Sequence, residues 1–171
     1  MKDTLETINR MQSDGVITKY AVGGAVGATL YLEPSATLDI DVFVLFPGAS
    51  TGGLVSLSPI YRYMQALGLR AQGEHIMVGN WPVQFLVPGS ELEKEAVEDA
   101  VETEVDGVRT WIMTAEHLVA IALQTGRAKD HARILHFLEK KAVDIEALKT
   151  ILTRHGLDSK WSRFRERYLD E

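Results

Sequence analysis

The sequence predicts an α+β fold in which helices flank a mixed β-sheet and a helical segment follows at the C-terminal end. Segments with strand character alternate with helical patterns as far as residue 113, whereas only helical periodicity follows Thr114. The 171 residues are 46% hydrophobic and 25% charged, which is typical of a globular protein. We therefore expect residues 1–113 to form an α/β core and residues 114–171 to pack on it as part of one structural unit.

The beginning of the chain predicts a helix, a strand and a second helix. Apolar residues at three-residue spacing predict an amphipathic helix over residues 3–13 that covers a sheet. A strand is expected over residues 18–22. The glycine pair at 23–24 then turns the chain into an apolar helix over residues 25–32, which ends before Pro34. This segment therefore has the pattern of a strand, a tight turn and a helix.

The next segment predicts a strand inside the sheet. Residues 40–46 are apolar apart from one carboxylate, Asp41, as expected for a strand covered on both faces. A helix is expected over residues 60–67, because Gly68 follows its last apolar residue. The sheet is thus expected to continue after a helical connection.

Two strands, over residues 74–78 and 83–87, are expected to pair as a hairpin. The residues between them, Gly-Asn-Trp-Pro at 79–82, favour a turn over a continued helix. A charged helix is expected over residues 91–101. A last strand, over 108–113, leads to Thr114, which is expected to cap the first of four helices over residues 115–125, 128–140, 144–154 and 158–169.

Charge and composition exclude several classes of protein. The net charge of -6 opposes indiscriminate binding of nucleic acid, so a polynucleotide partner would need a local basic patch. The absence of cysteine excludes disulfides, thiolate zinc sites and cysteine nucleophiles. No apolar run approaches the ~20 residues that span a bilayer, and the first residues are acidic where an export signal would be basic. We expect a cytoplasmic protein that does not contact membranes.

The segment most informative about chemistry joins the glycine pair to two aspartates, Asp39 and Asp41. Residues two apart on a strand point to the same face roughly 7 Å apart, so these carboxylates can converge on shared cations. Two buried like charges need a cation or another partner, and Mg²⁺ with phosphate oxygens would be such a partner. Gly23 and Gly24 open a helix, where backbone amides without an obstructing side chain can hold a phosphate.

This pattern resembles the nucleotidyltransferase superfamily, in which a Gly-Gly or Gly-Ser turn and a helix precede Asp-x-Asp on a strand. The resemblance extends to its minimal and AbiEii-like members, which include toxins and antitoxins. It implies a nucleotidyltransferase-like sheet, catalytic aspartates that hold Mg²⁺ or Mn²⁺, and an NTP such as ATP as substrate. The matching segments are Val22-Gly23-Gly24-Ala25 and Thr37-Leu38-Asp39-Ile40-Asp41-Val42-Phe43, within which Gly23, Gly24 and Thr37 are expected to bind the nucleotide.

A second similarity lies downstream, so that the resemblance covers most of residues 18–138. Members of these groups carry a helix and then an Arg-x-Lys-Asp element, which corresponds here to Arg127-Ala128-Lys129-Asp130. The resemblance implies that Lys129 contacts the triphosphate, that Arg127 assists, and that Asp130 orients a base or caps the helix. Cations at this place would neutralise the charge that develops during phosphoryl transfer.

The chain also departs from the family pattern. Active members carry a third carboxylate on a later strand, where this sequence has Gln84. An amide coordinates a metal weakly and cannot accept the proton of a nucleophile, so its presence affects catalysis more than nucleotide binding. Glu74, on the neighbouring predicted strand, would replace the acid only if the hairpin brings it toward Asp41. The family's arginine before Asp-x-Asp is also absent.

Simpler interpretations of the same residues remain open at this point. The two aspartates can cap the entrance of a strand in solvent, the glycine pair can be an ordinary turn, and the charges at 127–130 can be a solvated start of a helix. The alternative function is a nucleotide-binding or protein-interaction module with weakened catalysis, as one part of a toxin–antitoxin pair. Acceptor and protein partner are not specified by the sequence.

Overall fold

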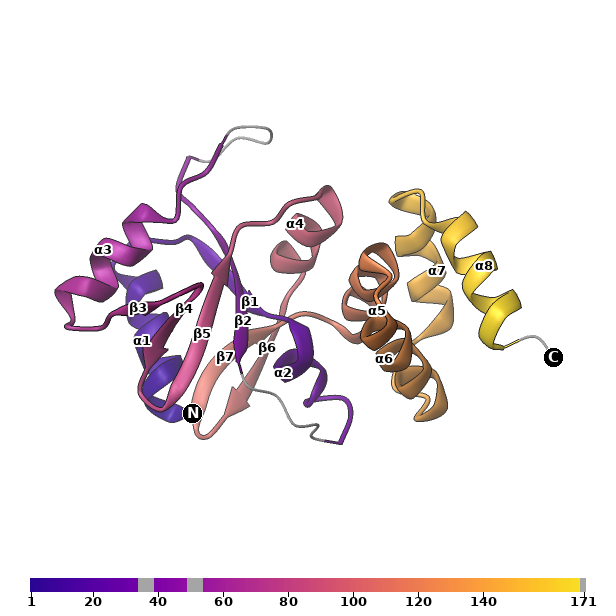
Figure 1. Ribbon diagram of the computed structural model, residues 1–171, viewed down its shortest axis with the longest axis horizontal. Coiled ribbons are helices and arrows are strands. Elements are labelled where there is room, and N and C mark those ends of the chain that lie inside the picture. Colours follow the sequence, from indigo (N-terminus) through magenta and orange to yellow (C-terminus); the bar gives the residue numbers. More distant parts are fainter. Residues whose placement is uncertain (34–38, 49–53, 170–171) are drawn as a thin grey trace.

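The computed structural model describes residues 1–33, 39–48 and 54–169. Within these residues, seven strands form one mixed sheet in the order β3-β4-β5-β2-β1-β7-β6 (Figure 1). β1 is parallel to β7 and β2 is parallel to β5, whereas the other neighbours are antiparallel. The strands are β1 (Lys19–Val22), β2 (Ile40–Leu45), β3 (Ala71–Gln72), β4 (His75–Val78), β5 (Trp81–Leu86), β6 (Val101–Val105) and β7 (Val108–Ile112).

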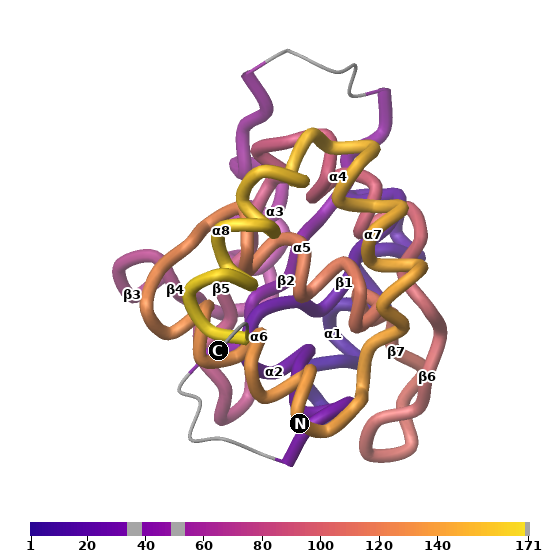
Figure 2. Tube along the Cα trace, turned by 90° about the vertical axis from the view of Figure 1, so that its right-hand side faces the viewer, coloured from indigo at the N-terminus to yellow at the C-terminus, as the bar shows by residue number. Residues whose placement is uncertain are grey.

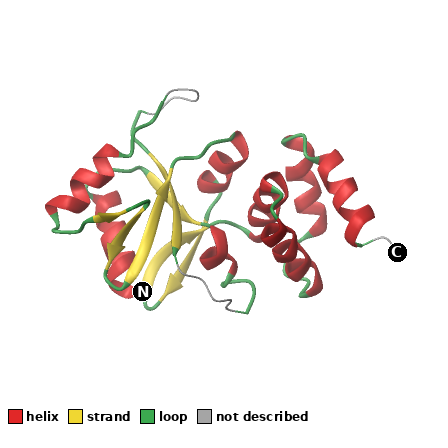
Figure 3. Cartoon of the chain, in the orientation of Figure 1, coloured by secondary structure: helices red, strands yellow, loops and turns green. Residues whose placement is uncertain are grey.

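Helices cover both faces of the sheet, and the C-terminal helices form a further layer (Figures 1 and 3). α1 and α3 lie on one side, and α2 and α4 lie on the other, where α5 packs against both of them. α6, α7 and α8 contact α5, and Figure 2 looks onto this layer. No helix in the described part of the chain is long and apolar enough to cross a membrane. The helices are α1 (Lys2–Ser13), α2 (Gly24–Ala28), α3 (Ser58–Ala66), α4 (Glu91–Glu98), α5 (Ala115–Thr125), α6 (Ala128–Glu139), α7 (Ile145–Arg154) and α8 (Asp158–Tyr168).

Strand alternation sorts the apolar side chains into two cores, one on each face of the sheet. On β2, Ile40, Val42 and Val44 belong to the core that contains α1 and α3. Phe43 belongs to the other core, which contains α4 and the C-terminal helices. Because side chains two apart on a strand share a face, Asp41 lies on the Phe43 side. The sheet therefore presents this carboxylate toward the C-terminal helices.

α5 is the central element of the second core and determines where α6 begins. Most of its residues are buried, as expected for a helix surrounded by other helices. The Thr114 hydroxyl accepts a hydrogen bond from the backbone N–H of His117 at 3.2 Å, which caps the first turn. Gly126 ends the helix in a left-handed conformation, with φ of 70°. The chain therefore reverses directly before Arg127, the residue that precedes α6.

The predicted fold class is confirmed, and the differences from the sequence prediction concern the ends of elements and two strands that were not predicted, β3 and β6. α2 ends at Ala28, and the expected continuation to residue 32 is a series of turns. α4 ends at Glu98, so Val101 begins a strand instead of ending a helix. This strand, β6, was missed because three of its five residues are charged or polar. The hairpin turn is also shorter than predicted, because Trp81 and Pro82 already belong to β5.

One difference changes the position of a candidate site residue. The sequence predicts a strand from residue 74, whereas β4 begins at His75. Gly73 and Glu74 form a two-residue turn that joins β4 to the short strand β3, and Gly73 has φ of 64°. Such a turn suits a tight hairpin, because glycine takes positive φ without strain. Glu74 is therefore not bound by the side-chain alternation of a strand.

Candidate active site

The two aspartates lie where β2 begins, beside the turn that follows β1. Asp39 directly precedes the strand and Asp41 is its second residue. The backbone N–H of Gly23 donates to the carbonyl oxygen of Asp41 at 2.9 Å, which joins the glycine turn to this part of the strand. Asp41 is half-buried, whereas the side chain of Asp39 is 40% exposed. The pair therefore combines a shielded carboxylate with an accessible one.

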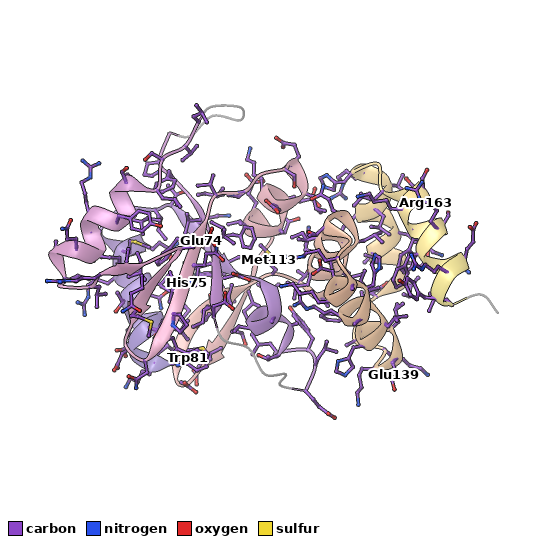
Figure 4. The ribbon with its side chains drawn as sticks, viewed as in Figure 1. Glu74, His75, Trp81, Met113, Glu139 and Arg163 are labelled. Atoms are coloured by element: carbon purple, nitrogen blue, oxygen red, sulfur yellow. The ribbon has the colours of Figure 1, made fainter. Side chains whose placement is uncertain are left out.

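The glycine pair leaves the space that the Asp41 carboxylate occupies. Gly24 has φ of 58°, and a Cβ at this position would overlap Oδ2 of Asp41. A Cβ at Gly23 would come within 3.0 Å of the sulfur of Met113 and 3.1 Å of the Phe43 ring, and Figure 4 labels Met113 between the sheet and the C-terminal helices. α2 has only five residues, so its dipole is small. We therefore attribute the role of the glycine pair to the close approach of neighbouring side chains and to its exposed backbone, and not to a helix dipole.

Strand register places a row of polar side chains on the same face as Asp41. In the parallel pair of β2 and β5, Asp41 lies opposite Gln84. In the antiparallel pair of β4 and β5, Ile76 lies opposite Val83, so His75 is the next residue across from Gln84. Neighbours in register point to the same face of a sheet. His75, Gln84 and Asp41 thus form one row across three strands.

Hydrogen bonds link this row to the residues around it. Nε2 of His75 lies 3.0 Å from Oδ2 of Asp39, where a carboxylate accepts and the imidazole N–H donates. Nε2 of Gln84 donates to Oε2 of Glu74 at 3.5 Å. His75 therefore orients one of the two aspartates, and Gln84 brings Glu74 to the same group of residues.

Cationic side chains at the start of α6 act on the aspartates. Lys129 and Arg133 both interact electrostatically with Asp41, and so does Arg127. Lys129 and Arg133 are four residues apart and hence lie on one side of the helix. This places the positive charge of the C-terminal layer across from the negative charge of the sheet.

Asp130 fixes the beginning of α6 and holds Arg127. Its carboxylate is buried and accepts hydrogen bonds from the backbone N–H of Arg127 at 3.2 Å and from Nε of the same residue at 2.7 Å. Burial works against its ionisation, but these hydrogen bonds outweigh it and lower the pKa of Asp130. Of the two roles that the resemblance implies for Asp130, the contacts support capping, since its oxygens face Arg127.

The aspartate pair has the electrostatics of a cation site. Burial raises the pKa of Asp41, and the neighbouring charge of Asp39 raises it further. Arg133, Lys129 and His75 lower it without cancelling these effects. A cation between the carboxylates would relieve both the burial and the repulsion. Their oxygens are the ligands that Mg²⁺ prefers, so these residues fit the metal that the resemblance implies.

A second group of potential metal ligands lies elsewhere, at the C-terminal end of α4 and on α5. Ligand atoms of Glu95, Asp99 and His117 lie within 4.8 Å of one another. Glu95 already accepts hydrogen bonds from Arg154 at 2.7 Å, from His155 at 2.9 Å and from His117 at 3.1 Å. The other ring nitrogen of His117 is bonded to Thr114 at 2.7 Å. Because the chain itself satisfies Glu95 and His117, we assign no metal to this group.

Two solved structures share the fold. The solution structure of the antibiotic-resistance factor ANT(2'')-Ia has a TM-score of 0.53 and 14% identity, and the match covers 98% of this chain and 96% of that one. An antigenic nucleotidyltransferase-like protein from Paracoccidioides brasiliensis has a TM-score of 0.53 and 13% identity, over 89% of this chain and 87% of that one. This chain has the nucleotidyltransferase fold. No protein-family model matches the sequence, and neither does any curated protein.

Within the nucleotidyltransferase fold, most of the residues singled out in the sequence lie around the start of β2. Gly23, Gly24 and Gln84 adjoin the aspartates through the backbone or the register. Arg127, directly before α6, and Lys129, in its first turn, act on Asp41. Thr37, expected to bind the nucleotide, lies outside the described residues. Sequence reasoning missed His75 and Arg133. Arg133 had a signal, its four-residue spacing from Lys129, whereas His75 required the register of β4.

Proposed function

We propose that this protein is a nucleotidyltransferase, which transfers a nucleoside monophosphate from a magnesium-bound NTP to an acceptor and releases pyrophosphate. The observation that carries the proposal is the arrangement around Asp41. This half-buried carboxylate with a raised pKa has a second aspartate beside it, and cations face it from α6. A divalent cation beside the aspartates and a polyphosphate beside the cations of α6 would neutralise both groups of charge, as binding of a metal-bound NTP requires.

Each part of the site has a distinct role in this proposal. Asp39 and Asp41 hold Mg²⁺ or Mn²⁺, which supplies positive charge to the phosphate oxygens. Gly24 leaves room for the Asp41 carboxylate, and together with Gly23 it exposes backbone to the phosphates. Lys129, assisted by Arg127, balances the negative charge of the triphosphate and of the leaving pyrophosphate.

The two parts of the chain act together in this proposal. Residues 1–113 contribute the carboxylates and the glycine turn, and residues 114–171 contribute the cations and the helical layer behind them. Binding of the nucleotide between them requires both parts, so we treat them as one functional unit. A cytoplasmic location, the binding of ATP and the narrower likeness to minimal and AbiEii-like nucleotidyltransferases remain predictions.

Gln84 favours a second candidate function, a module that binds Mg·NTP without turnover. It lies directly beside Asp41, and its amide accepts no proton at neutral pH. Such a module would transmit the presence of a nucleotide to a protein partner, as in a toxin–antitoxin pair. Nucleotidyl transfer needs another proton acceptor near the row of His75, Gln84 and Asp41, whereas binding of Mg·NTP without turnover needs none.

Titration of each NTP with Mg²⁺ tests the proposal. With glycerol present as a small hydroxyl acceptor for the nucleoside monophosphate, binding and pyrophosphate release are followed for the wild type and for the double variant Asp39→Asn/Asp41→Asn. This variant removes both charges with little change in shape. We expect metal-dependent binding and release in the wild type and neither in the variant. Binding without release would favour the second function, and binding that does not depend on the aspartates would refute the assignment of the site.

A further inference from the structure

Transfer to a hydroxyl group requires a proton acceptor, and the contacts around the row of His75, Gln84 and Asp41 limit which side chains can fill this role. As the hydroxyl oxygen attacks the α-phosphorus, its proton must leave to a positioned base. Asp39 and Asp41 serve as metal ligands under the proposed function, on which this inference rests. Gln84 cannot accept the proton, and His75, whose Nε2–H donates to Asp39, has only Nδ1 left to accept it. Among the groups that these contacts join, Glu74 is the remaining carboxylate.

The turn before β4 allows Glu74 to reach this row. A residue that preceded His75 within the strand would point to the opposite face, into the core that contains α1 and α3. Because Glu74 lies in the turn with Gly73, its side chain is free of that alternation. Its Oε2 lies 3.5 Å from Nε2 of Gln84, and Gln84 is the register neighbour of Asp41. Figure 4 labels Glu74 and His75 together on this part of the sheet.

Exposure of Glu74 fits the role of a group that meets an incoming substrate. Its side chain is exposed, so an acceptor can approach it from solvent without displacing the core. The Gln84 amide N–H donates to one carboxylate oxygen and leaves the other with open lone pairs. Gln84 is thus suited to hold a base in place, although it cannot itself be one.

We propose that Glu74 is the catalytic base of this protein and that Gln84 positions it. The acceptor's hydroxyl oxygen forms a bond to the α-phosphorus of the NTP, and the bond from that phosphorus to the oxygen bridging to the β-phosphorus breaks. Pyrophosphate leaves with the electron pair of that bond, and the hydroxyl proton passes to the Glu74 carboxylate. The acceptor is accordingly a hydroxyl compound, because a phosphate acceptor is already ionised and needs no base.

Moving the carboxylate between the two positions tests this assignment. The proteins compared are the wild type, Glu74→Gln, the exchange variant Glu74→Gln/Gln84→Glu and the control Glu104→Gln, which removes an exposed carboxylate from β6 at the other edge of the sheet. Release of pyrophosphate from Mg·ATP is measured with glycerol as a small hydroxyl acceptor. Mn²⁺ binding is measured separately by electron paramagnetic resonance.

We expect Glu74→Gln to lower kcat by about 10²-fold or more, as for loss of a general base. Its affinity for Mn²⁺ and Mg·ATP should stay within about threefold of the wild type, since Glu74 does not hold the metal. The exchange variant should recover at least about tenfold of the lost kcat, and Glu104→Gln should match the wild type.

Three results would overturn the assignment of Glu74. In the first, Glu74→Gln turns over like the wild type. In the second, it loses Mn²⁺ binding in step with kcat, which would make Glu74 a metal ligand or a structural residue. In the third, the exchange variant shows no recovery although it binds Mg·ATP. If the wild type itself binds Mg·ATP and releases no pyrophosphate, then the proposed transferase function fails together with this role for Glu74.

Discussion

Two clusters of charge in this molecule have similar residues and opposite electrostatics. Around Glu95, a carboxylate on α4 accepts hydrogen bonds from His117 of α5, from Arg154 of α7 and from His155 directly after α7. Burial works against ionisation of Glu95, but these hydrogen bonds outweigh it and lower its pKa to about 2. Around Asp41, burial and the charge of Asp39 raise the pKa. Donors of the chain itself stabilise the charge of Glu95, whereas the positive groups around Asp41 do not fully offset its burial and the charge of Asp39.

The difference shows how structural and functional carboxylates can be told apart. A carboxylate whose oxygens are all engaged by donors of its own chain holds elements together, here the core helix α4 and the helices α5 and α7. A carboxylate that is shielded from water next to a like charge lowers stability, and such an arrangement is typical of sites that bind a cation or a substrate. Variants of the two clusters should therefore differ in which property they change.

The largest expected change in stability comes from Glu95→Gln. This substitution removes the charge that three donors share, and it leaves the buried His117 and the mostly buried His155 with a neutral partner. We expect a loss of about 3 kcal/mol in the free energy of unfolding, measured in urea. Glu98→Gln on the same helix is the matched control, because Glu98 is exposed and lies 3.9 Å from Lys94. That control should change stability by less than about 0.5 kcal/mol.

The same cluster predicts a pH dependence whose sign follows from the low pKa of Glu95. The folded-state pKa of about 2 lies below the ordinary value of 4.5. The stabilisation is therefore fully present above about pH 4.5 and is lost as the pH falls toward 2. Unfolding free energies between pH 6 and pH 3 should fall more steeply for the wild type than for Glu95→Gln. Parallel curves for the two proteins would show that the hydrogen-bond partners of Glu95 do not lower its pKa in the folded state.

Gly24→Ala should affect the site of Asp41 rather than the fold. A Cβ at Gly24 would overlap Oδ2 of Asp41 and force this carboxylate to move. We expect a loss of about thirtyfold in affinity for Mg·ATP, as for a displaced metal ligand. Gly15→Ala is the control, because Gly15 also has a positive φ, of 77°, but no atom lies near its added Cβ. Both variants should lose similar stability, and equal affinities would contradict the close approach at Gly24.

His75→Ala is expected to have the smallest effect of the three substitutions. It removes the hydrogen bond to Oδ2 of Asp39 and leaves both aspartates in place. We expect the affinity for Mn²⁺ to fall by about tenfold, because a partner that orients a metal ligand is lost. His75→Gln keeps an N–H donor at a similar reach and should restore most of the affinity. If His75→Gln binds Mn²⁺ no better than His75→Ala, the hydrogen bond does not orient Asp39.

Local patterns made the fold class and much of the candidate site accessible from the sequence. The glycine pair, the two aspartates and Lys129 could be singled out because their chemistry lies in short segments with recognisable spacing. Gln84 could be aligned with the family's third carboxylate because it lies in a short apolar stretch, and the strand register then placed it beside Asp41. The inferences from the sequence needed no knowledge of which residues on distant strands face each other.

Residues whose position depends on register or on the end of an element could not be placed in advance. His75 joins the site only through the pairing of β4 with β5. Glu74 changes from a strand residue to a turn residue by a shift of one position, and that shift decides which face its side chain can reach. β6 was missed because its charged residues resemble the preceding helix. Small differences at boundaries therefore had large consequences for side-chain direction.

Stabilisation by Mg·ATP tests the contrast between the two clusters most directly. The free energy of unfolding is measured with and without Mg·ATP for the wild type, Asp41→Asn and Glu95→Gln. A ligand that binds the folded state at a hundred times its Kd adds about 2.7 kcal/mol. We predict this increment for the wild type and for Glu95→Gln, although the latter starts from lower stability, and none for Asp41→Asn. An increment that persists in Asp41→Asn and disappears in Glu95→Gln would contradict the assignment of the site to the aspartates of β2.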